Sequence, residues 1–259
     1  MTGSETGMPD LSIVIPAFNE AQRLPESFAR LKAYQATRPF ISEVIVVDDG
    51  STDGTSEVAK QWAREWPLLR LVRGEHRGKG GAVRTGVLAA TGAYIALADA
   101  DFSMPVEEFD RFSVQELGAY DFAIGSREAP GARRFNEPGY RHIMGRGFNA
   151  LVRNLLIPSI QDTQCGFKCI RGEVAADLCR HQTIEGWGFD VELLYIARLR
   201  GYRVIEVPIF WYYMPGSRVN PIRDTVTMVR DVLSIRRNGA RGCYDVEVQA
   251  APAQSPVPR

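Results

Sequence analysis

The chain has 259 residues, 45% of them hydrophobic, with 31 basic and 31 acidic side chains and a formal net charge of zero. This length and composition predict one domain with a large core. The balanced charge argues against nucleic acid as a partner and against an acidic disordered chain, so partners must be inferred from local sites.

The chain opens with MTGSETGMPD, which has neither the basic n-region nor the apolar h-region of a signal peptide. We expect residues 1–10 to be a flexible leader. The longest uncharged apolar stretch, Gly86 to Ala98, is shorter than the roughly 20 residues of a spanning helix. Together with four cysteines that form no CxxC pair, these features predict a cytoplasmic protein with reduced thiols.

Short apolar runs alternate with longer helical patterns in the first half, at residues 11–16, 43–48, 69–73 and 93–98. Continuous Ile and Val runs indicate strands covered on both faces, as in a mostly parallel sheet between helices. We expect Thr52 or Asp53 to cap a helix reaching Trp66, and Ser103 to cap another with Pro105 near its start. The pattern predicts an α/β, Rossmann-like fold.

Polar clusters follow three of these strands. Pro16, Phe18 and Glu20 follow the first strand, and Asp49 follows the second within VDDGSTDGT. Because ligands of such sheets bind beyond the carboxyl ends of the strands, we expect these clusters to meet in one nucleotide crevice. An Asp there can accept hydrogen bonds from a base imide or a ribose hydroxyl.

Glycines and cations open the next helix, in RGKGGAVR at residues 77–84. Exposed amides at a helix start, with Lys79 and Arg84 nearby, would hold a phosphate group. The P-loop pattern GxxxxGK[ST] is absent, and a glycine-rich turn with solvated cations is the alternative.

Asp99 and Asp101 follow the fourth strand two residues apart, so we expect both carboxylates to point the same way. Two aligned carboxylates repel each other unless a cation joins them. Mg²⁺ or Mn²⁺, completed by substrate phosphates, is the usual arrangement, which makes both residues candidate metal ligands. For an isolated DxD, a solvated turn or a helix cap is the alternative.

The second half is expected to contain strands at 121–126 and 204–210 and helices at 140–156, 191–199 and 220–237. The last helix would carry an apolar stripe of Ile222, Val226, Val229 and Leu233 with arginines around it. Such a stripe predicts either peripheral docking on a membrane or packing on the core of the domain. Residues 239–259 are predicted to be a disordered tail.

Two further groups of side chains have open interpretations. The aromatic residues Trp187, Trp211, Tyr212 and Tyr213 would stack on sugars, sit at a lipid headgroup interface, or fill the core. A zinc site is a weak alternative for the other group, because its spacing fits no usual pattern. That group consists of Cys165, Cys169, Cys179 and His181.

The motifs IVIPAFNE, VIVVDDGSTDGT, RGKGGAVRTG, ADAD, GSR, DTQCGFK and GFDVELLYIA span residues 11–237. Together they resemble the inverting glycosyltransferases of the GT-A fold in family 2, and more narrowly the dolichyl-phosphate (polyprenyl-phosphate) β-glucosyltransferases. The resemblance implies one catalytic domain over 11–238, with a nucleotide-sugar half at 11–118 and an acceptor half at 119–238. It also implies UDP-glucose as donor, a polyprenyl phosphate as acceptor, and work at the cytoplasmic face of a membrane.

The resemblance also implies roles for single residues. Asp101, Arg127, Arg141 and Asp190 would be catalytic, and Arg127, Arg141 and Arg218 would bind the acceptor phosphate. The nucleotide sugar would contact Pro16, Phe18, Glu20, Asp49, Lys79, Arg84 and Asp99, with Asp99 and Asp101 at the metal.

The acceptor decides whether a general base is needed. A phosphate is already anionic near neutral pH, so an arginine clamp suffices to hold it. A hydroxyl acceptor would need a base, for which Asp190 is the candidate, with a helix N-cap as its alternative role.

Four other functions stay open from the sequence. These are transfer to a soluble acceptor, GDP-mannose-dependent mannosyl transfer to a polyprenyl phosphate, nucleotidyl transfer, and nucleotide binding without catalysis. Relatives in the mannosyl branch often have Gln at the position of Ser103, which favours the glucosyl branch.

Overall fold

A computed structural model describes residues 10–38, 40–113, 120–214 and 221–245. Its centre is a seven-stranded sheet with the order β3-β2-β1-β4-β7-β5-β8. Every neighbouring pair is parallel except those of β7, which is antiparallel to both β4 and β5. The strands are β1 (Leu11–Ala17), β2 (Ile41–Asp48), β3 (Leu69–Arg73), β4 (Tyr94–Leu97), β5 (Phe122–Ser126), β7 (Lys168–Arg171) and β8 (Val204–Pro208).

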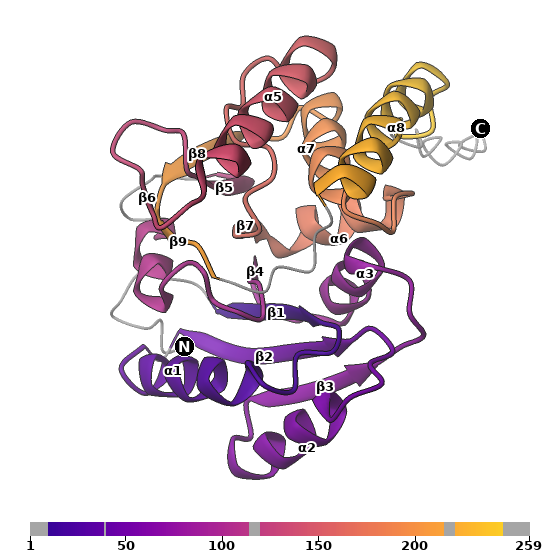
Figure 1. Ribbon diagram of the computed structural model, residues 1–259. Helices are drawn as coiled ribbons and strands as arrows, with labels where there is room; N and C mark the ends of the chain where they lie inside the picture. The colour runs from indigo at the N-terminus through magenta and orange to yellow at the C-terminus, as the bar shows by residue number, and fades with distance from the viewer. Residues whose placement is uncertain (1–9, 39, 114–119, 215–220, 246–259) are drawn as a thin grey trace, which may run out of the picture.

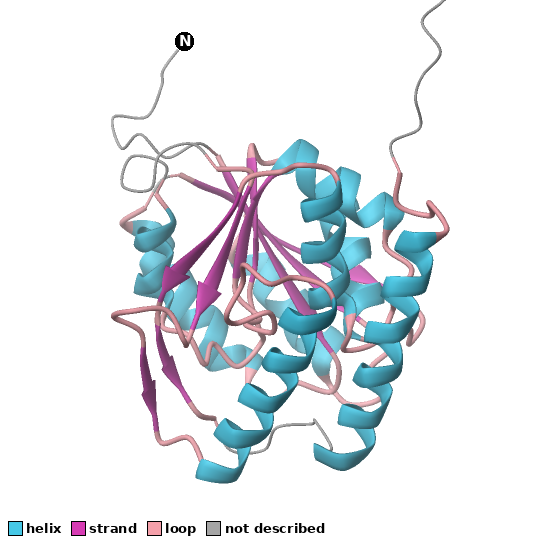
Figure 2. Cartoon of the chain, turned by 90° about the horizontal axis from the view of Figure 1, so that it is seen from above, coloured by secondary structure: helices cyan, strands magenta, loops and turns pink. Residues whose placement is uncertain are grey.

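Helices flank this twisted sheet (Figure 2). In Figure 1, α1 and α2 lie beside β2 and β3, whereas α5, α7 and α8 gather over the other half of the molecule. The bounds are α1 (Leu24–Ala36), α2 (Thr55–Glu65), α3 (Lys79–Ala89), α5 (Gly139–Leu155), α6 (Gly172–His181), α7 (Phe189–Leu199) and α8 (Pro221–Ala240). No helix among these described residues is both long and apolar enough to span a bilayer.

The continuous apolar runs of the sequence form the middle of the sheet, as predicted. Ile13, Val14 and Ile15 of β1 are fully buried, and the three valines and two isoleucines of β2 are at most 2% exposed. Because side chains on both faces of these strands are buried, helices must cover both faces. The mixed α/β fold with a mostly parallel central sheet is confirmed, and this sheet continues through β7 from the first half of the chain into the second.

Two predicted elements are wrong in detail. The helix expected from Ser103 is a 3-10 helix, η1 (Val106–Phe112), which Pro105 precedes without a side-chain cap. The strand expected at 204–210 is two strands, because the ladder of β8 ends at Pro208, which has no N–H to donate. The next strand, β9 (Phe210–Tyr212), pairs with β6 (Arg133–Phe135) in a separate two-stranded sheet.

The predicted tail is also partly ordered. α8 continues to Ala240, and Tyr244 is fully buried, with its hydroxyl donating to Glu192 Oε1 at 2.7 Å. The prediction of disorder from residue 239 is therefore wrong up to Asp245, because a buried aromatic ring and its hydrogen bond hold this segment. Residues 1–9 and 246–259 lie outside the described residues.

Candidate active site

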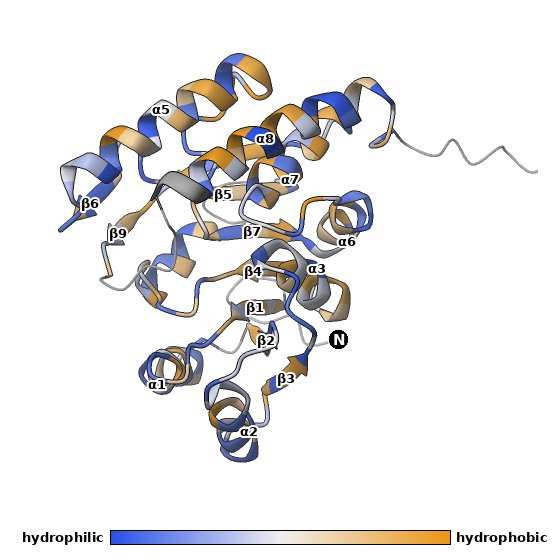
Figure 3. Ribbon diagram, turned by 45° about the vertical axis from the view of Figure 1, so that its right-hand side comes forward, coloured by the Kyte–Doolittle hydropathy of each residue, from blue (hydrophilic) through white to orange (hydrophobic). Residues whose placement is uncertain are grey.

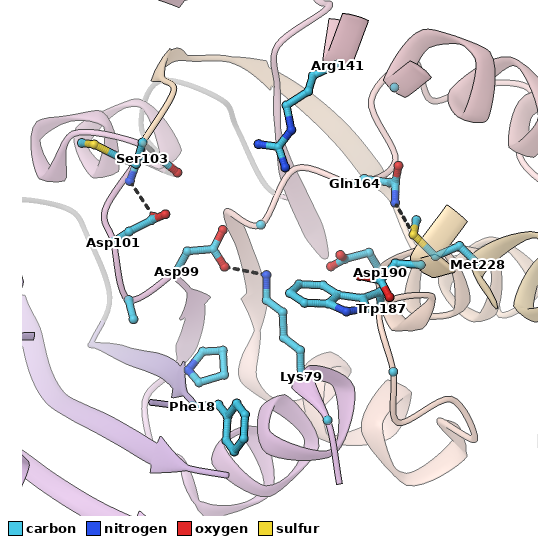
Figure 4. A pocket seen from close by; sticks show the side chains of 18 of the residues that line it. Phe18, Lys79, Asp99, Asp101, Ser103, Arg141, Gln164, Trp187, Asp190 and Met228 are labelled. Atoms are coloured by element: carbon cyan, nitrogen blue, oxygen red, sulfur yellow. Dashed lines mark hydrogen bonds and ion pairs between the residues drawn. The ribbon is translucent and has the colours of Figure 1, made fainter. Parts of the chain in front are cut away.

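A cavity of about 800 Å³ lies at the carboxyl ends of β1, β2 and β4, with residues of α5 and α8 also in its wall. Figure 4 shows how the side chains converge from both halves of the chain. Ten predicted site residues line it: Pro16, Phe18, Glu20, Asp49, Lys79, Asp99, Asp101, Arg127, Arg141 and Asp190. The predicted convergence of strand ends is thus present in the structure.

One end of the cavity combines stacked rings with a carboxylate. The rings of Phe18 and His76 are stacked with their centroids 4.1 Å apart, and His76 Nδ1 lies 2.8 Å from Asp49 Oδ2. Asp49 also accepts the backbone N–H groups of Arg77 and Gly78 at 2.9 and 2.8 Å. It therefore ties the glycine-rich segment to the end of β2, while free lone pairs remain for a nucleoside. His76 was missed because a lone loop histidine carries no periodic or motif signal.

The two carboxylates of the DxD motif have different surroundings. Strand β4 ends at Leu97, so strand alternation does not align them; a turn with Phe102 at φ 42° brings both to the cavity. Asp99 Oδ1 lies 2.6 Å from Lys79 Nζ. Asp101 accepts the Ser103 N–H at 3.0 Å, and no cationic side chain pairs with it among the described residues (Figure 4).

Charge balance distinguishes the two acids. Burial alone would lower the pKa of Lys79, but the carboxylates of Asp99 and Asp190 outweigh it and raise that pKa. Burial raises the pKa of Asp99, yet Lys79 outweighs burial and holds this pKa below its usual value. Burial and the neighbouring Asp99 raise the pKa of Asp101. Among the residues that the structure describes, Asp101 is thus the carboxylate of the motif without an ion-pair partner, and Lys79 acts on it only at longer range.

This donor set fits a divalent cation that shares its ligands with a substrate. Among the described residues no group of three or more His, Cys, Asp or Glu side chains is arranged to hold a metal ion. Asp101 would therefore supply one hard oxygen, with diphosphate and water oxygens completing the shell, as Mg²⁺ and Mn²⁺ accept. The zinc alternative has no such support, because Cys165, Cys169 and Cys179 are buried free thiols.

Arg127 is held rigidly at the side of the cavity. Its Nε and Nη2 donate to Asp162 at 2.7 and 2.9 Å, its backbone N–H donates to the same carboxylate, and its guanidinium lies 5.4 Å from the Trp211 ring centre. Burial alone would raise the pKa of Asp162, but Arg127 outweighs burial and lowers it to about 2. Arg127 therefore lines the cavity as a fixed, permanently charged fork.

Further arginines extend this cationic side. Arg141, in the first turn of α5, lies 5.2 Å from the Tyr213 ring centre. Arg134 also lines the cavity, and it pairs with Glu128 and Glu137 at 2.6 and 2.7 Å. Arg134 was missed because the charges of its segment resemble those of a solvated loop.

Comparison with known proteins identifies the family. Residues 12–179 match the family model described as Glycosyl transferase family 2. The chain belongs to glycosyltransferase family 2. The dolichyl-phosphate beta-glucosyltransferases of Drosophila melanogaster and Homo sapiens are 39% and 35% identical to it. These alignments cover 87% and 92% of this chain, and 74% and 78% of the two relatives.

A solved structure shares the fold of this glycosyltransferase. It is glucosyl-3-phosphoglycerate synthase from Mycobacterium tuberculosis, in complex with Mn²⁺, UDP-glucose and phosphoglyceric acid. The TM-score is 0.62 at 21% identity, and the match covers 88% of this chain and 78% of that one. At this identity the likeness establishes the GT-A fold alone.

Asp190 of this glycosyltransferase lies at the base of the cavity and is not a helix cap. The N-cap of α7 is Gly188, and Asp190 lies in the first turn, 2.5 Å from Lys168 Nζ. Burial raises the pKa of Asp190, while Lys168 and Lys79 partly offset that effect. Lys168 was missed, although a lysine inside a short apolar strand is a recognisable signal for a buried ion pair.

Of the remaining predicted residues, some line the cavity and others do not. Arg84 lies on α3 near Cys179 of α6 and does not line the cavity, and Arg218 lies outside the described residues. Of the four aromatic residues, Trp187, Trp211 and Tyr213 line the cavity. Tyr212 does not, because its ring stacks on Phe135 at 4.4 Å.

Proposed function

We propose that this glycosyltransferase moves glucose from UDP-glucose to a polyprenyl phosphate, with inversion at the anomeric carbon and with the aid of Mg²⁺ or Mn²⁺. One observation carries the proposal: the cavity joins a ring-and-carboxylate side to an arginine side on which Asp162 fixes Arg127. The two relatives named above, dolichyl-phosphate beta-glucosyltransferases, support the choice of sugar and acceptor.

The donor would lie along the side that Phe18, Asp49 and Asp99 form. Phe18 and His76 offer aromatic faces for a base, and Asp49 offers a carboxylate to its imide. A divalent cation on Asp101 would neutralise the charge that develops on the departing nucleoside diphosphate. Lys79, held between the two halves of the cavity, would add a second positive charge beside the leaving group.

The acceptor phosphate would lie on Arg127 and Arg141. A guanidinium binds phosphate with paired hydrogen bonds, so the clamp orients an oxygen that is already anionic and needs no general base. One displacement by this oxygen converts an α-linked donor into a β-linked product. In this scheme Asp190 neutralises the buried Lys168, and no general base is required of it.

The test is a transfer assay with purified protein and a short-chain polyprenyl phosphate in detergent. UDP-glucose with Mn²⁺ or Mg²⁺ should yield free UDP and a β-glucosyl phosphate, identified from its anomeric NMR coupling. EDTA should abolish the reaction. Faster transfer from GDP-mannose, or transfer to soluble acceptors such as 3-phosphoglycerate or a free sugar but not to the lipid, would contradict the proposal.

A further inference from the structure

Two neighbouring helices expose large apolar side chains beside the cavity. Ile143 of α5 is 71% exposed, and Val226 and Leu233 of α8 are 49% and 55% exposed. Tyr140 and Met144 of α5 are exposed as well. α5 and α8 lie side by side in Figure 3 and are in contact, so these five residues, called the α5–α8 face, belong to adjoining helices.

The core does not use this face. α8 packs inward through Met228, Val232 and Ile235, which are buried. Of the apolar stripe expected from the sequence, Val226 and Leu233 are exposed and Val229 packs partly against the core, while the side chain of Ile222 lies outside the described part of the chain. α8 therefore has one apolar side for the core and a second for another partner, and packing on the core explains only the first.

The charge of the two helices selects among partners. Within Gly139–Leu155 and Pro221–Ala240 there are seven arginines and two acidic residues, a surplus of five positive charges. The whole chain has a formal net charge of zero, so this surplus is local. Apolar side chains among arginines match an interface that offers both hydrocarbon and anionic groups, as an anionic bilayer does.

The same helices also form part of the cavity wall. Met144 and Phe148 of α5 and Met228 of α8 line it, and Arg141 of α5 belongs to the proposed phosphate clamp. A phosphate in this clamp is thus near the helices that carry the exposed apolar residues. A lipid phosphate could enter the cavity by its headgroup while its chain stays beside the α5–α8 face.

We infer that the α5–α8 face docks on the surface of an anionic bilayer and presents the cavity to a lipid phosphate there. The inference rests on the proposed function for the nature of the acceptor. The docking itself is a separate property, which can be measured without any transfer reaction.

The first experiment measures binding of the full chain to vesicles of phosphatidylcholine, with and without phosphatidylglycerol, by co-sedimentation. The wild-type protein should sediment with the anionic vesicles at low salt and less at high salt. The variant Ile143→Ser with Leu233→Ser should lose about tenfold or more in vesicle partition, because each apolar side chain gains from burial in the interface.

A matched control removes apolar side chains from other surfaces. Leu88 of α3 and Leu199 of α7 are also exposed, and neither lines the cavity. Leu88→Ser with Leu199→Ser should sediment like the wild type, and circular dichroism should be unchanged for both double variants. Equal binding by all three proteins, or no binding even at low salt, would overturn the inference.

The second experiment separates docking from transfer. With polyprenyl phosphate in detergent micelles, the Ile143/Leu233 variant should match the wild-type rate; with the same lipid in vesicles, it should fall about tenfold. An equal fall in both media would overturn docking as the role of the face. Absence of transfer in detergent for every protein would instead remove the proposed acceptor, while vesicle binding would still test docking.

A second copy of this chain is the competing occupant of the face. Light scattering should give a monomer for the wild-type protein in the absence of lipid. A dimer that dissociates when Ile143 and Leu233 are changed to serine would overturn the bilayer inference in favour of self-association.

Discussion

The two carboxylates of the DxD motif have different partners in the structure. Asp99 is neutralised by Lys79 and packs so closely on Gly166 that a Cβ at Gly166 would clash with its carboxylate. Asp101 is hydrogen-bonded to Ser103 and has no ion-pair partner among the described residues. The sequence predicted two equivalent metal ligands, because the neutralising lysine comes from a helix that begins 20 residues earlier.

Asp101→Asn should abolish glycosyl transfer and leave the fold intact. We expect kcat to fall by about a thousandfold, because charge neutralisation of the leaving diphosphate acts in the transition state. The thermal midpoint should change little, since the side chain contributes no packing. Asp110→Asn is the control: this carboxylate pairs with Arg38 and does not line the cavity. Full activity of Asp101→Asn, with normal metal dependence, would remove Asp101 from the site.

Asp162→Asn should uncouple Arg127 from its position. We expect acceptor-dependent transfer to fall more than the slow hydrolysis of donor by water, and Arg127→Lys to show the same pattern because a point charge replaces a fork. An equal fall of both reactions would mean that Arg127 serves the donor or the fold. Donor affinity, measured by titration with UDP, should stay near that of the wild type.

Asp162→Asn should also change how the free energy of unfolding depends on pH. The pKa of Asp162 is lowered from 3.8 to about 2 in the folded protein, so its ionised form stabilises the fold above about pH 4. At pH 7 the variant should be less stable by about 3 kcal/mol, since a buried arginine loses its partner. This difference should shrink as the pH falls from about 4 towards 2. Urea unfolding of both proteins across this range tests it, and a constant difference would contradict the assignment.

At the scale of elements, the sequence predicts best where one local pattern decides the structure. The runs of β1 and β2 are apolar throughout, and burial on both faces follows from that alone. Strand β7 was not predicted, because KCIR is short and the charge of its Lys168 is neutralised by Asp190 from another element. Site residues at strand ends were predictable for the same reason as the strands. His76 and Lys168, in contrast, depend on Asp49 and Asp190, which are distant in the chain.

The glycines of RGKGG also make contacts that no local sequence pattern predicts. They were interpreted as exposing amides to phosphate, but the structure shows them packed against the segment before α7. A Cβ at Gly80 would lie 2.7 Å from the Ile184 carbonyl oxygen and 2.7 Å from Phe189 Cβ, and Gly81 donates its N–H to the Glu185 carbonyl at 3.1 Å. These glycines thus let α3 approach the wall of the cavity.

Gly80→Ala should therefore damage both the stability and the activity of the enzyme. Alanine gains about 1 kcal/mol of helix propensity, but a clash with backbone atoms costs about 1–3 kcal/mol and moves the start of α3. Because Lys79 directly precedes Gly80 and would move with the start of α3, we expect kcat/KM to fall by about a hundredfold. Gly74→Ala is the control, since a Cβ there meets no atom within 4 Å. Wild-type kinetics for Gly80→Ala would show that the close approach is not needed.

At the scale of the whole molecule, the described end of the chain supports the donor side of the cavity. The Tyr244 hydroxyl donates to Glu192, whose carboxylate accepts the backbone N–H groups of Thr183 and Ile184. Gln182, just before them, donates to the Gly80 carbonyl at 2.9 Å. A continuous set of hydrogen bonds therefore joins the segment after α8 to the helix that carries Lys79.

Shortening the chain should reveal this connection. Removal of residues 246–259 should leave the thermal midpoint unchanged, because their sequence predicts no packed structure. Removal of residues 241–259 should lower it by roughly 5–10 °C, through loss of a buried tyrosine. We also expect a higher KM for the nucleotide sugar. Tyr244→Phe keeps the ring and removes the hydroxyl, so it separates the effect of packing from that of the hydrogen bond. Equal thermal midpoints for the two truncated proteins would contradict this role of Tyr244.

This arrangement also sets an order of events during protein synthesis. A ribosome delivers the chain from its N-terminus, so β1, β2, β3 and β4 are available to pair long before Tyr244 emerges. Glu192, which holds the loop beside the start of α3, receives the hydrogen bond of the Tyr244 hydroxyl only after that late residue has been made. A nascent chain can thus assemble most of its nucleotide-binding sheet while the wall of the catalytic cavity is still incomplete. Competence for transfer would then follow the emergence of Tyr244 from the ribosome, and proteolytic loss of Tyr244 would reverse it.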